Sequence, residues 1–159
     1  MTFKTADLSD ANEGKLQIAR PGLRDFGGNS QFHGEMVTIR ADGDFSRVRE
    51  QVNLPGNDKV LVVDNDAALN CAMLGDLLAA AALKNGWSGV IINGCIRDAA
   101  DIAHMEIGVK ALAVYPQRGS RQDRGEVNVE VEFLGATFSP GEYLYSDEDG
   151  ILLSPVPLI

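Results

Sequence analysis

The sequence predicts a mixed α/β fold, in which a mixed sheet is accompanied by a few helices, and three observations lead to this expectation. The chain has 159 residues, about the size of one domain. Its middle alternates apolar strand patterns with a helical pattern, and its last third contains short strand patterns separated by turns. Hydrophobic residues make up 45% of the chain, enough to bury a core, so residues 1–159 are expected to form a single domain.

The first half of the chain is predicted to hold two short helices and two strands. Residues 5–14 favour a short helix, and residues 21–30 are rich in glycine and turn residues. Residues 36–39 follow with an apolar strand pattern, and residues 45–52 with an amphipathic helical pattern. Residues 59–63 are a lysine followed by four consecutive apolar residues, a run that is typical of a buried strand.

The middle of the chain predicts a helix, a strand and a second helix. Residues 70–85 are dominated by alanine and leucine, and the Asn85-Gly86 pair supplies a stop signal for this helix. Residues 89–92 form the next apolar strand pattern. A glycine-containing turn over residues 93–98 places charged side chains at the end of this strand, and a helix over residues 99–105 is expected to follow.

The last third of the chain is predicted to be rich in strands. Residues 109–115 resemble a strand, and residues 127–133 alternate apolar and polar side chains, the pattern of a half-buried antiparallel strand. Residues 143–145 and 151–153 are two further short apolar segments, joined by an acidic turn over residues 147–149. This succession favours a mixed sheet over a complete doubly wound sheet.

The charge and the cysteine content exclude several classes of protein. The chain carries 14 lysine and arginine residues against 23 aspartate and glutamate residues, a net charge of −9 that disfavours nucleic acid and anionic lipid as partners. No apolar stretch is long enough for a membrane span, and the N-terminal residues do not resemble a signal peptide. Cys71 and Cys95 lack the spacing of a zinc site or a disulfide framework. We therefore expect a cytoplasmic protein that binds neither nucleic acid nor membrane.

The segment Gly75-Asp76-Leu77-Leu78 is the first candidate site, because it lies near the start of the predicted alanine-rich helix. Unpaired backbone N–H groups and the positive end of the helix dipole favour a carboxylate or a phosphate there. The alternative is structural, with Gly75 allowing close packing and Asp76 capping the first turn. The segment alone leaves both interpretations open.

Arg97, Asp98 and Asp101 form the second candidate site. The Arg97 guanidinium can hold a carboxylate or enolate oxygen, and Asp98 can ligate a hard divalent cation. In a helix that starts near Asp98, the spacing to Asp101 places both carboxylates on roughly one face, able to bind one ion directly or through its waters. The alternative is a surface ion pair between Arg97 and Asp98 together with a helix cap. Both candidate segments follow buried strands, at the sheet edge where α/β proteins place ligands, so they are expected to face one pocket.

Other reactive side chains give weaker signals. His33 and His104 lie far apart in the sequence and have no companion at metal-binding spacing. Ser88 lacks the motif of a serine hydrolase, and the position of Cys95 beside a glycine favours packing over reactivity.

Together these motifs resemble one known family. The resemblance rests on Gly75-Asp76-Leu77-Leu78, on residues 86–98 (GWSGVIINGCIRD) and on Asp101, and it extends to residues 26–28, 62–64, 107–112 and 149–152. The chain closely resembles the RraA-like family, which groups the regulators of ribonuclease E activity with class II 4-hydroxy-4-methyl-2-oxoglutarate aldolases. The regulators lack the metal-binding aspartate after the arginine, so Asp98 favours the aldolase branch.

The resemblance implies a swivelling β/β/α fold, a homotrimer, and pockets at the subunit boundaries. In the aldolases, the amides matching the segment Gly75-Asp76-Leu77-Leu78 hold pyruvate, and the arginine matching Arg97 contacts it. The aspartate matching Asp98 ligates a divalent ion directly, and Asp101 matches a second acidic position that reaches the ion through water.

The expected function is that of a lyase, the metal-dependent retro-aldol cleavage of 4-hydroxy-4-methyl-2-oxoglutarate to two pyruvates, with oxaloacetate decarboxylation as a secondary activity. Both reactions pass through a pyruvate enolate, which Mg²⁺ or Mn²⁺ would stabilise, with Arg97 as a second positive charge. Either a metal-bound water or Asp76 would move the proton of the substrate hydroxyl. The alternatives are a non-catalytic regulator that binds a ribonuclease or an RNA helicase, and a protein that binds a 2-keto acid without turnover.

Overall fold

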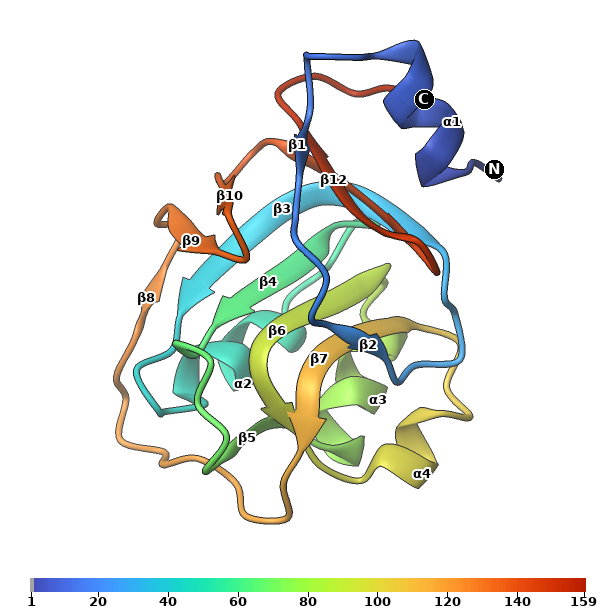
Figure 1. Ribbon diagram of the computed structural model, residues 1–159. Coiled ribbons are helices and arrows are strands. Elements are labelled where there is room, and N and C mark those ends of the chain that lie inside the picture. The colour runs from blue at the N-terminus through green and yellow to red at the C-terminus, as the bar shows by residue number, and fades with distance from the viewer. Residues whose placement is uncertain (1) are drawn as a thin grey trace.

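The structure is a computed structural model that describes residues 2–159, and a mixed sheet with helices forms its body (Figure 1). The helices are α1 (Thr5–Ala11), α2 (Ser46–Val52), α3 (Asp76–Lys84) and α4 (Ala99–Ile102). The strands are β1 (Gln17–Ile18), β2 (Arg24–Asp25), β3 (Phe32–Arg40), β4 (Val60–Asp64), β5 (Ala72–Leu74), β6 (Gly89–Ile96), β7 (Gly108–Val114), β8 (Glu126–Val127), β9 (Val131–Phe133), β10 (Ala136–Phe138), β11 (Tyr143–Asp147) and β12 (Gly150–Ser154). The predicted mixed α/β fold is confirmed.

The main sheet contains both parallel and antiparallel strands. Its order is β1-β12-β11-β3-β4-β6-β7-β2, with β5 paired to β6 and β8 paired to β3. Strands β3, β4, β6 and β7 run parallel, whereas β11 and β12 form an antiparallel pair. The long strand β3 joins the two arrangements, because residues 32–35 pair with β11 and residues 36–40 pair with β4.

The parallel strands form the centre of the core because both of their faces are covered. Every residue of β6 is buried, as are the first four of β4, and a continuous apolar run is what such a strand requires. Helices α2, α3 and α4 pack on one face, and β9 to β12 cover the other (Figure 1). Gly89 and Gly108 are register partners on β6 and β7, and a side chain at either would overlap the ring of Phe32.

Two predicted elements were wrong in extent. The helix predicted over residues 70–85 begins only at Asp76, because Ala72–Leu74 form β5 and pair with the end of β6. The strand predicted over residues 127–133 is divided, since Asn128 has a φ of 61° and donates its N–H to the Thr38 carbonyl between β8 and β9. In both places, contacts with a strand distant in the sequence override the local pattern.

Other boundaries differ by a few residues. The turn predicted over residues 93–98 is shorter, because β6 continues to Ile96 between β5 and β7. The helix predicted over residues 99–105 ends at Ile102, and the strand predicted over residues 36–39 extends from Phe32 to Arg40. Within residues 2–159, no helix is long and apolar enough to cross a membrane.

Candidate active site

A cavity of about 220 Å³ lies where β5 and β6 end. It is lined by both candidate segments, with the exception of Asp101, and by residues from α2 and from the loop that follows β7. The lining residues are Phe45, Arg49, Ala72, Met73, Leu74, Gly75, Asp76, Leu77, Leu78, Arg97, Asp98, Arg118 and Arg121.

Pairing of β5 with β6 brings the two candidate segments together. The strands run parallel, and each is followed directly by a site residue, Gly75 after β5 and Arg97 after β6. The Arg97 N–H donates to the Leu74 carbonyl at 2.9 Å, which holds the two strand ends side by side. The cavity therefore lies at the carboxyl edge of parallel strands, where α/β proteins commonly bind ligands.

Carboxylates of the chain itself occupy the N-terminus of α3. The Asp76 N–H donates to Asp98 Oδ2 at 2.9 Å, and the Leu77 N–H donates to Asp76 Oδ1 at 2.8 Å. Gly75 permits this arrangement, because a Cβ at that position would stand 2.7 Å from Asp98 Oδ2. The start of α3 thus binds carboxylates, as expected from the helix dipole and the free N–H groups. Gly75 also allows close packing, which was the structural alternative for this segment.

Asp98 has an unusual backbone conformation for a residue other than glycine. Its φ of 58° and ψ of 41° lie in the left-handed region, and the residue is exposed. This conformation costs about 1 kcal/mol, and residues that adopt it are held by their surroundings, often at functional sites. Asp98 precedes α4 without capping it, and its carboxylate contacts the start of α3 instead.

Arg97 is half-buried, and its Nη1 atom donates to the Pro116 carbonyl at 3.4 Å. Among residues 2–159, no ion pair joins Arg97 to Asp98 or to another carboxylate. The alternative of a surface ion pair between Arg97 and Asp98 is therefore wrong. Both side chains line the cavity and can interact with a molecule that enters it.

Asp98 is the residue whose position suits a divalent cation. Asp101 is exposed on α4 and does not line the cavity, so its role in ion binding stays a prediction. The described part of the chain contains no group of three or more His, Cys, Asp or Glu side chains that could enclose an ion. Mg²⁺ usually takes one or two protein carboxylates and completes its shell with water and substrate oxygens, so a carboxylate at the wall of a cavity fits it.

The sequence analysis missed one part of the cavity wall. Arg49 lies on α2, and Arg118 and Arg121 lie on the loop between β7 and β8. Arg118, Arg121 and Arg124 form a basic cluster in an otherwise acidic chain. This cluster would have indicated the loop as a candidate anion-binding segment.

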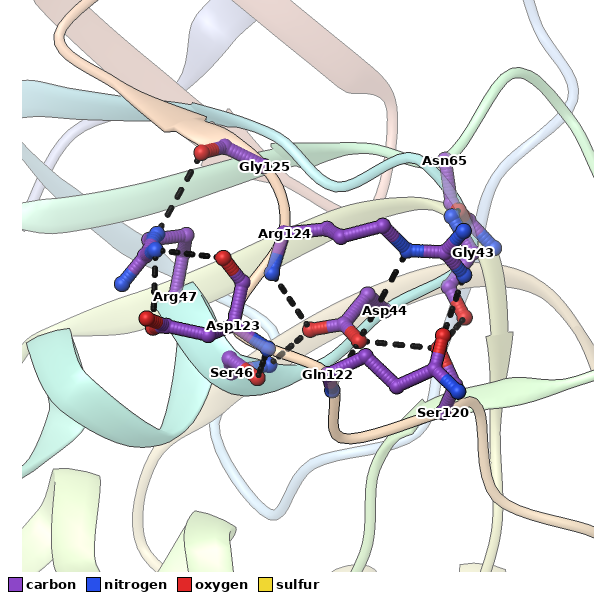
Figure 2. A network of polar contacts seen from close by, with 10 residues as sticks. All are labelled: Gly43, Asp44, Ser46, Arg47, Asn65, Ser120, Gln122, Asp123, Arg124 and Gly125. Atoms are coloured by element: carbon purple, nitrogen blue, oxygen red, sulfur yellow. Dashed lines mark hydrogen bonds and ion pairs between the residues drawn. The ribbon is translucent and has the colours of Figure 1, made fainter.

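Asp44 holds the loop between β7 and β8 through a network of polar contacts (Figure 2), and it is fully buried. It accepts hydrogen bonds from four donors: the Ser120 hydroxyl at 2.8 Å and the backbone N–H groups of Ser46, Gln122 and Arg124. Burial raises the pKa of the Asp44 carboxyl, but these hydrogen bonds outweigh burial and hold the pKa well below its usual value. The ionised Asp44 thereby fixes the loop that carries two cavity arginines.

The weaker candidates lie outside the cavity. Cys95 is buried within β6, and burial raises the pKa of its thiol, as expected of a packing residue. The His33 ring stacks on Tyr145 with 5.5 Å between ring centroids. Neither residue lines the cavity.

Comparison with known proteins places these features in a family. The family model described as RraA-like, Aldolase/RraA, matches residues 5–153. A protein of Pseudomonas fluorescens (strain Pf0-1), described as "Putative 4-hydroxy-4-methyl-2-oxoglutarate aldolase", is 48% identical over 156 residues. The match covers 98% of this chain and 96% of that protein.

Two solved structures share the fold over nearly their whole length. The S-adenosylmethionine: 2-dimethylmenaquinone methyltransferase from Geobacillus kaustophilus HTA426 has a TM-score of 0.96 and 38% identity, covering 98% of this chain and 97% of that one. The RNA-processing inhibitor RraA from Thermus thermophilis has a TM-score of 0.96 and 36% identity, covering 100% of this chain and 96% of that one. These relatives have different names on one fold, so function has to be argued from the site residues. By sequence and by structure alike, this chain belongs to the RraA-like family.

Proposed function

We propose that this chain is a divalent-metal-dependent aldolase that cleaves 4-hydroxy-4-methyl-2-oxoglutarate to two pyruvates and also decarboxylates oxaloacetate. One observation carries the proposal: Gly75, Arg97 and Asp98 line one cavity at the N-terminus of α3. The description of the Pseudomonas fluorescens relative supports it. Both reactions make the same demand on the site, which is stabilisation of a pyruvate enolate.

The 2-oxo acid end of the substrate would lie between the start of α3 and Arg97. The helix dipole and the N–H groups of Gly75 and Leu78 favour the substrate carboxylate, because the Asp76 and Leu77 N–H groups already donate to the carboxylates of Asp98 and Asp76. The Arg97 guanidinium would donate to an oxygen that becomes more negative as the enolate forms, so Arg97 stabilises the transition state more than the bound substrate. Its contact with the Pro116 carbonyl holds the arginine at the cavity wall.

Mg²⁺ or Mn²⁺ would be held by the Asp98 carboxylate, with Asp101 as a second contact through water. When bound, the ion supplies a Lewis acid that polarises the 2-oxo group. Asp98 suits this role because, among residues 2–159, no lysine or arginine forms an ion pair with it. Its Oδ2 atom and the Arg97 side chain both lie beside Gly75, so the two groups would face the same end of the substrate.

Asp76 would accept the proton in the aldol cleavage. Its carboxylate lines the cavity, and the Leu77 N–H fixes one of its oxygens. As the proton leaves the substrate 4-hydroxyl, the C3–C4 bond breaks and C4 becomes the carbonyl carbon of one pyruvate. The electron pair of the broken bond passes to the enolate of the second pyruvate, which solvent then protonates at carbon.

The test is an assay of pyruvate formation from 4-hydroxy-4-methyl-2-oxoglutarate and from oxaloacetate, with Mg²⁺, with Mn²⁺ and after chelation. We expect turnover of both substrates, abolished by a chelator and restored by added ion. Asp76→Asn should slow cleavage far more than decarboxylation, because only cleavage removes a hydroxyl proton. Asp66→Asn, an exposed aspartate outside the cavity, is the matched control. Absence of turnover of both substrates with either ion would refute the proposal.

A homotrimer with pockets at the subunit boundaries is part of the proposal. Leu77 lines the cavity, yet the residue is 80% exposed. A neighbouring subunit at this point would remove apolar surface from water and complete the cavity wall. Light scattering at micromolar concentration tests the assembly, and a monomer with full activity would contradict the interfacial site.

A second candidate function is regulation of a ribonuclease, which the similarity to the RNA-processing inhibitor favours. The net charge of −9 suits contact with a basic segment of a ribonuclease or an RNA helicase. The test is inhibition of ribonuclease E by the purified protein and by its Asp98→Asn variant. A regulator should inhibit equally well with and without this carboxylate.

A further inference from the structure

The cavity concentrates positive charge in an acidic protein. Of the 14 lysine and arginine residues in the chain, four arginines line this one cavity. They are Arg49, Arg97, Arg118 and Arg121. The chain as a whole carries a net charge of −9, so this local excess of guanidinium groups is a specific feature of the site.

The cavity arginines have no carboxylate partner within residues 2–159, in contrast to arginines nearby. Arg47, two residues before Arg49 on α2, forms ion pairs with Glu50 at 2.6 Å and Asp123 at 2.9 Å. Arg124, on the same loop as Arg118, lies 4.0 Å from the Asp44 carboxylate. Carboxylates of the chain thus neutralise Arg47 and Arg124 beside the cavity, whereas the cavity arginines can pair with an anion from outside.

Three of the four arginines come from other elements than the groups assigned to the 2-oxo acid. Arg97 and the start of α3 come from the ends of β5 and β6, whereas Arg49 comes from α2 and Arg118 and Arg121 come from the loop after β7. Arg118 also lines an adjoining depression of about 650 Å³, together with Arg97. The positive charge therefore extends beyond what a single carboxylate requires.

The arginine loop is fixed before any ligand binds. The Ala72 N–H donates to the Gln117 carbonyl at 2.8 Å, and the Gly119 N–H donates to the Ala72 carbonyl at 3.0 Å, so the loop is tied to β5 on both sides of Arg118. The Arg118 guanidinium carbon stands 5.8 Å from the centroid of the Phe45 ring, a cation–π contact that supports the side chain. A preorganised guanidinium loses less entropy when it binds a carboxylate.

We propose that Arg118, with Arg121 and Arg49, binds the distal carboxylate of a dicarboxylic 2-oxo acid, so that the site selects dianionic substrates over 2-oxo acids with one carboxylate. The inference rests on the proposed function, since it takes Arg97 and the start of α3 as the position of the 2-oxo acid end. The inference adds the arginines that distinguish a substrate with a distal carboxylate from one of equal length without it. Guanidinium groups match carboxylates in shape and charge, which gives this selection a direct physical basis.

The test compares two five-carbon ligands, 2-oxoglutarate and 2-oxopentanoate, which differ only in the distal carboxylate. Their dissociation constants are measured by titration calorimetry with Mg²⁺ present, on the wild-type protein and on Arg118→Gln and Arg121→Gln. The matched control is Arg24→Gln, an exposed arginine outside the cavity that also lies over a phenylalanine ring, 4.9 Å from the centroid of Phe26. All three variants remove one positive charge.

We expect the wild type to bind 2-oxoglutarate at least about tenfold more tightly than 2-oxopentanoate. Arg118→Gln should remove most of this preference by weakening 2-oxoglutarate alone, Arg121→Gln should reduce it, and Arg24→Gln should leave it unchanged. Equal affinity of the wild type for both ligands, or equal weakening of both by Arg118→Gln, would overturn the distal subsite while leaving the aldolase proposal to its own assay. If neither ligand binds the wild type, the assignment of the cavity to 2-oxo acids fails as well.

Discussion

Asp98 lines the cavity and Asp44 holds a loop of the cavity wall, and the two differ in how completely the chain satisfies their carboxylates. Asp44 is fully buried and accepts hydrogen bonds from four donors. Asp98 is exposed, and among the described residues its carboxylate accepts one hydrogen bond, from the Asp76 N–H. An ionised carboxylate can accept about four hydrogen bonds, so Asp44 is saturated and Asp98 is not.

This difference separates support from reactivity. The saturated Asp44 carboxylate ties the loop between β7 and β8 to the start of α2. A substitution of Asp44 should therefore lower the stability of the protein. The unsaturated carboxylate retains acceptor positions at a cavity, in a backbone conformation that the chain holds against its local preference. A substitution of Asp98 should therefore reduce ligand binding and turnover.

The largest effect is expected for Asp98→Asn, which removes the charge of the proposed metal ligand. Oxaloacetate decarboxylation with Mg²⁺ should fall by about 100-fold or more, while the unfolding temperature stays close to that of the wild type. Asparagine tolerates the left-handed backbone, so the fold should persist. Asp101→Asn should have a smaller effect. If Asp98→Asn has wild-type activity at saturating Mg²⁺, Asp98 is not the metal ligand.

Arg97→Lys should reduce transition-state stabilisation by about 2–4 kcal/mol, chiefly in kcat, because lysine keeps the charge but loses the planar fork. Inhibition by pyruvate should weaken in parallel. Steady-state kinetics and a thermal unfolding curve check this. Unchanged kinetics with a lower unfolding temperature would make Arg97 a structural residue like Arg47.

Asp44→Asn should lower the free energy of unfolding by about 2 kcal/mol at neutral pH, because it places an amide among N–H and hydroxyl donors. The pKa of Asp44 is depressed in the folded state, so its stabilisation is fully present above the unfolded-state pKa of about 3.9 and is lost as the pH falls through the folded-state pKa. The difference between wild type and variant should therefore shrink below about pH 4. Denaturant titrations at a series of pH values measure it, and a difference independent of pH would exclude the ionised carboxylate as its source.

The smallest effect is expected for Gly75→Ala. The backbone of Gly75, with φ of −127° and ψ of −167°, is open to alanine, but the new Cβ would stand 2.7 Å from Asp98 Oδ2. The Asp98 side chain must move, so the transition state should lose about 1 kcal/mol of stabilisation and turnover should fall accordingly. The free energy of unfolding should change little. A loss of stability without a loss of turnover would show that Gly75 serves packing alone.

Much of the framework followed from the sequence by itself. The apolar runs that became β4 and β6 are local patterns, and both are buried as predicted. A shared cavity for Gly75 and Arg97 was also expected, because both segments follow buried strands, although the strand directly before Gly75 is β5, which the sequence analysis took for helix. These features depend on the period and order of neighbouring residues, which a sequence displays directly.

The tertiary structure decided the features that depend on partners far along the chain. Ala72–Leu74 lie in an alanine- and leucine-rich stretch that favours a helix, and only pairing with β6 makes them a strand. The donors that surround Asp44 from the loop lie 76, 78 and 80 residues away, so the residues near Asp44 in the sequence do not indicate its burial. Arg49, Arg118 and Arg121 meet at one cavity for the same reason: local propensity acts over a few residues, whereas the convergence of a helix and a distant loop is set by how the whole sheet packs.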